Sequence, residues 1–140
     1  MKHSVMLTIS SLLLVLFLTF HLADDIVRGF EPGGLSNLMG GVLITVVWLY
    51  GIVVLAERRS GYIIMLLGSL FSLVVPIVHM KGPKGVGVTS RLVNTSGHFF
   101  FVWTLIAIGV TGLFSVILSA HGLWSLQRGQ SRSPNAPLKA

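Results

Sequence analysis

The chain has 140 residues, of which 53% are apolar and only 10% are charged, whereas a soluble protein carries about 25% charged residues. Its net charge of +6 is spread between long apolar runs instead of forming a basic stripe, which argues against nucleic-acid binding. The absence of cysteine excludes disulfides, thiolate metal sites and a cysteine nucleophile.

Four apolar runs are long enough to cross a bilayer as helices. A helix needs about 20 residues to span a hydrocarbon core roughly 30 Å thick. The runs cover about residues 5–23, 35–56, 61–80 and 98–120. Most of the connections are short, which favours antiparallel neighbours. We therefore predict an all-α integral membrane protein, an antiparallel four-helix transmembrane bundle that forms one domain over residues 1–126.

The two ends of the chain have different characters. The amino-terminal run is longer than the apolar core of a signal peptide and lacks a good small-residue cleavage pattern near Ala23, so we interpret it as a retained first helix. Residues 127–140 are polar and contain proline, which predicts a disordered tail.

The distribution of basic residues predicts the orientation of the bundle, because Lys and Arg favour the cytoplasmic side of a membrane. With the amino terminus inside, the cytoplasmic side would hold Lys2, Arg58, Arg59, Arg128, Arg132 and Lys139. The outer side would hold Arg28, Lys81, Lys84 and Arg91. The excess predicts a multi-pass protein of the cell membrane with both termini in the cytoplasm.

Ionisable side chains gather where the first helix ends. His21, Asp24, Asp25 and Arg28 follow one another at helical spacing, so they share one face. Charged and polar groups are costly within a membrane, which makes this column a candidate functional site. The alternative is an ordinary ion pair between Asp24 and Arg28 one helical turn apart.

Alternation of the helices brings two further histidines to the same level. The third run ends at His79 and the fourth begins at His98, both at the end of the bundle where the first run finishes. Imidazole and carboxylate ligands suit divalent transition metals. We therefore predict a site for zinc, iron or copper with His21, Asp25, His79 and His98 as ligands. Asp24 and Arg28 would then orient the ligands or hold an anionic substrate.

A haem fits this cluster less well than a metal ion does, because paired carboxylates are poor neighbours for haem ligands. A plainer interpretation of His79 and His98 is that both lie at the headgroup level without a ligand role. Two other features of the fourth run have simple structural interpretations. The small residues Thr111 and Ser115 indicate a helix contact seam. The run 99–101 indicates either a lipid-facing wall or one side of an apolar pocket.

Three functions are compatible with these features. The first is a membrane metal site, which would be catalytic on a lipophilic small molecule if it is an enzyme. The second is an accessory or structural subunit that assembles with a larger membrane partner or with copies of itself. The third is a proton-coupled transporter, which is disfavoured because the second, third and fourth runs contain no acidic or basic residue in mid-span.

Overall fold

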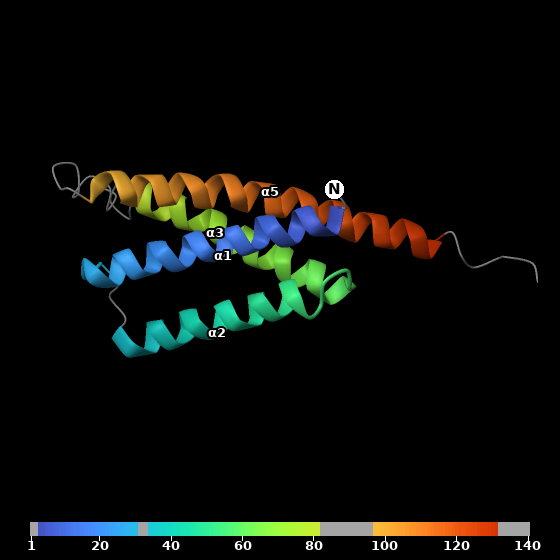
Figure 1. Ribbon diagram of the computed structural model, residues 1–140, viewed down its shortest axis with the longest axis horizontal. Coiled ribbons are helices and arrows are strands. Elements are labelled where there is room, and N and C mark those ends of the chain that lie inside the picture. Colours follow the sequence, from blue (N-terminus) through green and yellow to red (C-terminus); the bar gives the residue numbers. More distant parts are fainter. Residues whose placement is uncertain (1–2, 31–33, 82–96, 132–140) are drawn as a thin grey trace, which may run out of the picture.

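The computed structural model describes residues 3–30, 34–81 and 97–131, and nearly all of them are helical. Figure 1 shows the helices, which are α1 (His3–Val27), α2 (Gly34–Val53), α3 (Arg59–Lys81) and α5 (His98–Ser131). Successive helices run in opposite directions, and the start of α1 lies at the same end as the close of α5. The predicted all-α antiparallel four-helix bundle is confirmed.

All four helices are long and apolar enough to cross a membrane. Their outward faces carry many exposed large apolar side chains, as expected for a surface in contact with lipid. The last helix is the longest, with 34 residues and a length of about 51 Å. It continues through Gln127, where we expected the tail to begin, and ends at Ser131. Residues 132–140 of that expected tail lie outside the described residues.

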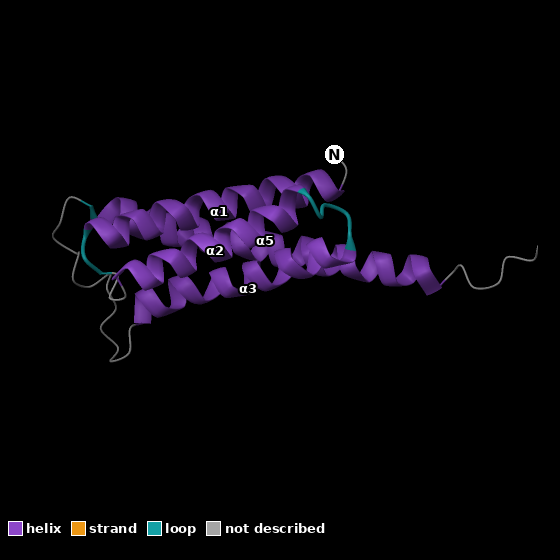
Figure 2. Cartoon of the chain, turned by 90° about the horizontal axis from the view of Figure 1, so that it is seen from below, coloured by secondary structure: helices purple, strands orange, loops and turns teal. Residues whose placement is uncertain are grey.

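The helices do not contact one another equally. α5 packs along both α1 and α3, whereas α2 packs mainly on α3 and less on α1. Figure 1 shows α5 and α2 on opposite sides of the bundle with α1 and α3 between them, and Figure 2 gives the perpendicular view. α5 therefore packs closely along both α1 and α3, which contact each other little, and α2 lies against the other side of this pair.

Small residues bring α5 close to its neighbours. The hydroxyl oxygens of Ser10 on α1 and Ser115 on α5 lie 2.9 Å apart in a hydrogen bond. Further along α5, a Cβ added to Gly122 would overlap the ring of Tyr62 on α3. These contacts fit a seam of small side chains, because lipid is as apolar as leucine and close packing must hold such helices together.

Two groups of buried apolar residues fill the interior. The larger group lies toward the end where α1 begins, and its members include Leu7, Leu14, Trp48 and Tyr62. In the smaller group, Phe101 and Leu105 pack with Phe30 and Val75 at the end where α1 finishes. The ionisable residues singled out in the sequence lie beside this second group.

Candidate metal centre

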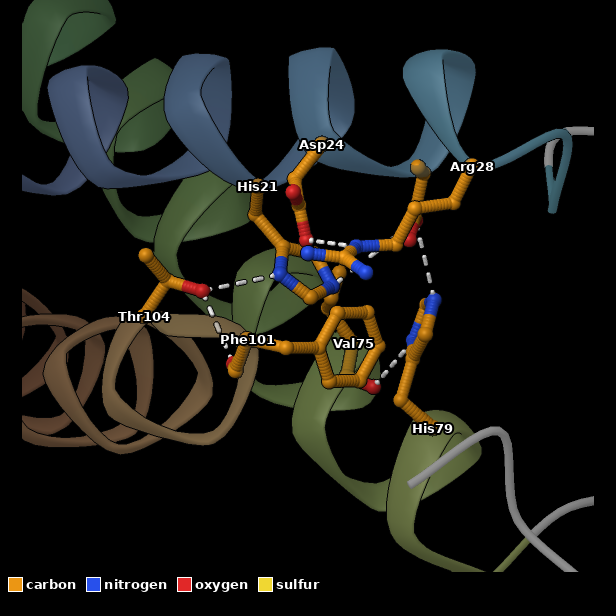
Figure 3. Close-up of polar contacts among 8 residues, drawn as sticks. His21, Asp24, Arg28, Val75, His79, Phe101 and Thr104 are labelled. Atoms are coloured by element: carbon orange, nitrogen blue, oxygen red, sulfur yellow. Dashed lines mark hydrogen bonds and ion pairs between the residues drawn. The ribbon is translucent and has the colours of Figure 1, made fainter. Parts of the chain in front are cut away.

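Helix alternation brings residues from α1 and α3 together at one end of the bundle. His21 and Asp25 lie one turn apart on α1, and His79 lies in the last turn of α3. Figure 3 shows His21 and His79 converging from these two helices. The candidate ligand atoms of the three residues all lie within 4.8 Å of one another. We call this group the His–Asp centre.

The separations within the centre are close to those of a metal site. Asp25 Oδ2 lies 3.1 Å from His79 Nε2 and 3.8 Å from His21 Nε2. Ligands at zinc-bonding distances around a tetrahedral ion are about 3.3 Å apart. The two separations from Asp25 Oδ2 therefore lie on either side of the spacing expected for ligands of one ion.

The second ring nitrogen of each histidine is held by a hydrogen bond. His79 Nδ1 donates to the carbonyl oxygen of Val75 at 2.9 Å. Thr104 Oγ1 donates its single proton to the carbonyl oxygen of Phe101, so it accepts from His21 Nδ1 at 3.0 Å. In its neutral form each imidazole would therefore carry its proton on Nδ1, and the Nε2 atoms of both rings lie near the same carboxylate.

With neutral imidazoles and an ionised Asp25, this arrangement would place three acceptors together without a proton between them. Within the described residues, His21 Nε2 and Asp25 Oδ1 are buried without a hydrogen-bond partner. The 3.1 Å contact between His79 Nε2 and Asp25 Oδ2 is a hydrogen bond when one of the two atoms carries a proton, and with neither protonated it needs a cation between them. The centre therefore needs added positive charge, which either protons or a metal ion can supply.

Apolar packing strengthens the electrostatics of the centre. His21 and Asp25 are only 2% and 6% exposed. The fully buried ring of Phe101 stands against both imidazoles, with centroids 4.8 Å from His21 and 5.9 Å from His79. In this low-dielectric setting an uncompensated charge is costly, so a bound cation would be held firmly. Phe99, by contrast, is largely exposed on the outside of the bundle.

Asp24 and Arg28 form an ion pair beside the centre. Arg28 Nε donates to Asp24 Oδ2 at 2.8 Å, and this hydrogen bond raises the pKa of the guanidinium. The guanidinium also covers Gly97, where an added Cβ would overlap it. The pair therefore joins the end of α1 to the start of α5. This is the plainer ion pair considered from the sequence, and Asp24 is not a member of the three-residue centre.

The group of three that the structure brings together does not include His98, the fourth predicted ligand. His98 begins α5 at the expected end of the bundle, but it is outside the His–Asp centre. Thr104 was missed by the sequence analysis, although it fixes the orientation of His21. The sequence contains a partial signal for it, because Thr104 is a polar residue within the fourth apolar run. In an antiparallel bundle this position lies at about the same level as His21.

A cavity of about 500 Å³ adjoins the centre between α1, α2 and α3. His21, Asp25 and His79 line one end of it, and the rest of its lining is mostly aliphatic and aromatic. The lining residues Val42 and Val46 are also about half exposed on the outside of α2, so the cavity is an open groove. We call it the α1–α2 groove.

No protein-family model, curated protein or solved structure matches this chain.

Proposed function

We propose that this protein is a multi-pass protein of the cell membrane that binds a divalent transition metal at the His–Asp centre. The observation that carries the proposal is the convergence of the Nε2 atoms of two imidazoles on one buried carboxylate. Hydrogen bonds from Nδ1 to a hydroxyl and to a backbone carbonyl are what metal-binding histidines ordinarily make on their far side.

A metal ion accounts for the arrangement better than a single proton does. A proton shared by His79 and Asp25 would satisfy their 3.1 Å contact but leave His21 Nε2 buried without a partner at 3.8 Å from the carboxylate. One ion bound by all three residues would satisfy the two nitrogens and the carboxylate together. Two neutral imidazoles with one carboxylate suit zinc, iron or copper.

Three protein ligands leave at least one coordination position for another molecule, as in catalytic zinc and iron sites. The centre adjoins the α1–α2 groove, so that position is accessible to a molecule held there. The ion would act as a Lewis acid on an oxygen atom of such a molecule. A lipophilic substrate is the class that fits the apolar surroundings.

Metal content of the purified protein tests the proposal directly. We expect the wild-type protein, purified in detergent and reloaded with zinc, iron or copper, to retain about one ion per chain after gel filtration. The His21→Ala and His79→Ala variants should each lose at least nine-tenths of it. Elemental analysis gives the stoichiometry, and circular dichroism checks that the helices remain.

His121→Ala is the matched control, because His121 on α5 packs against His3, with ring centroids 4.9 Å apart, at the end of the bundle where α1 begins. This variant should bind metal like the wild type. A wild-type protein that retains none of the three metals, or one whose metal survives the loss of both His21 and His79, would remove the proposal.

A further inference from the structure

We propose that the α1–α2 groove binds a single-chain lipid with a carboxylate head, such as a long-chain fatty acid, with the head oxygen on the metal of the His–Asp centre. This inference rests on the proposed metal site and names the class of molecule that the site takes. It is carried by the length of the groove, its lining, and the charge that a bound ion leaves at one end.

The groove has the length of one hydrocarbon leaflet. It extends from Ile26 to Val15 along α1, which corresponds to about 16 Å of helix rise. On α2 it extends over a similar distance, from Leu38 to Trp48. Half of a bilayer core is about 15 Å thick. A chain lying in the groove would therefore reach from the centre to the middle of the membrane.

The walls of the groove favour a hydrocarbon chain over a polar one. Its two threonines use their hydroxyl protons within their own helices, Thr19 to Val15 at 2.8 Å and Thr45 to Gly41 at 2.8 Å. Neither hydroxyl has a proton left to donate to a ligand. The lining also includes Trp48, whose Nε1 is a neutral donor that is buried without a hydrogen-bond partner among the described residues, at the other end of the groove. The ionisable groups of the lining, which can recognise a charged head, lie at the end that the His–Asp centre occupies.

Charge balance selects the head group. Two neutral imidazoles and the Asp25 carboxylate together carry one negative charge, so a divalent ion leaves the centre at +1. Asp24 and Arg28 neutralise each other through their ion pair and do not change this balance. A monoanionic oxygen ligand would complete the coordination and neutralise the buried charge, whereas an amine head would be repelled. Without metal, the negative centre would repel the same carboxylate.

Binding of hexadecanoate tests the inference. Labelled hexadecanoate is titrated into wild-type protein in detergent, with and without one equivalent of Zn²⁺, and zinc content is measured on the same samples. We expect the zinc-loaded protein to bind hexadecanoate at least tenfold more tightly than the zinc-free protein. Hexadecanol and hexadecylamine, which have the same chain length, should show no such gain.

Variants of α2 identify the groove as the binding site. Thr45→Phe places a ring in the groove and should weaken hexadecanoate binding at least tenfold while zinc stays bound, and Val42→Phe gives a second test at a neighbouring lining position. Met39→Phe is the matched control, because Met39 is on the same helix, is exposed and does not line the groove. Retained zinc reports that each variant is folded.

The outcomes separate the two proposals. A protein that binds zinc but shows equal affinity for hexadecanoate and hexadecanol, or no dependence on zinc, overturns the lipid inference alone. Hexadecanoate binding that is unchanged in both groove variants also overturns it. Absence of bound zinc in the wild type overturns the metal site itself.

Discussion

Two histidines in this bundle are oriented by different partners to the same effect. A threonine hydroxyl on α5 holds His21, and a backbone carbonyl one turn earlier on α3 holds His79. Each partner accepts a hydrogen bond from Nδ1, so that Nε2 of each ring lies near Asp25. The residues that decide the chemistry of the centre therefore include Thr104, which has no direct contact with the proposed ion.

Replacing Thr104 by valine tests this orienting role. Thr104→Val keeps the shape of the side chain but removes the acceptor for His21 Nδ1, so zinc affinity should fall about 10- to 100-fold. Thr104→Ser retains the hydroxyl and should stay within about threefold of the wild type. Competition with a chromophoric zinc chelator gives both affinities. Equal affinity in the valine variant would contradict the role assigned to Thr104.

Zinc affinity should also depend on pH in a definite direction. Protons compete with the ion for Nε2 of His21 and His79, because a ligating imidazole must be neutral. Affinity is therefore expected to fall at least ~tenfold between pH 7.5 and pH 5.5 and to recover when the pH is raised again. The same chelator competition measures it, and an affinity that rises in acid would show that these nitrogens are not ligands.

At the scale of the helices, close approach between α3 and α5 depends on a residue without a side chain. Gly122 lies under the ring of Tyr62, and there is no room for a Cβ between them. Gly122→Leu should therefore separate the two helices and lower the free energy of unfolding by about 1–3 kcal/mol. Ala120→Leu, at an exposed position two residues away, should change it little. Denaturation of the detergent-solubilised variants by sodium dodecyl sulfate measures the difference.

The helices themselves could be predicted well, because hydrocarbon requires each apolar run to satisfy its own backbone. The end of α5 could not be placed from the apolar run. Beyond Ala120 the sequence becomes more polar. Polar residues mark the end of an apolar span, but they are compatible with a helix that continues into water. There Arg128 stacks over Trp124 with its guanidinium 3.6 Å from the ring centroid. This contact supports helix in a segment where composition indicated a polar tail.

The sequence predicts the level of each site residue along the bundle, but it does not predict which way its side chain points. Antiparallel threading fixes the level of each residue along the bundle, which was enough to bring His21 and Asp25 together with His79. Rotation about each helix axis is set by side-chain packing, which the sequence of one helix does not specify. His98 therefore has the expected level along the bundle but is not part of the centre. Thr104, which was not predicted, forms a hydrogen bond with His21.

At the scale of the whole molecule, α1 begins and α5 ends at the same end of the bundle. If all four described helices cross the membrane, these two ends lie on one side of it. The bias of Lys and Arg predicts that this side is the cytoplasm. Alkaline phosphatase fused after Ala140 should therefore be inactive in a bacterial host, whereas green fluorescent protein at the same position should fluoresce. Fusions after Gly29, between α1 and α2, should give the opposite pattern. An active phosphatase at the carboxyl end would reverse the predicted orientation.

His21 and Asp25 belong to α1 whereas His79 belongs to α3, and this division has a thermodynamic consequence. An ion held by all three would cross-link two helices that otherwise share few direct contacts. By linkage, free metal at a thousand times its dissociation constant would add about 4 kcal/mol to the stability of the folded bundle. Resistance to heating would then rise with the logarithm of metal concentration, so the protein's lifetime in the cell would report how much metal is available to it.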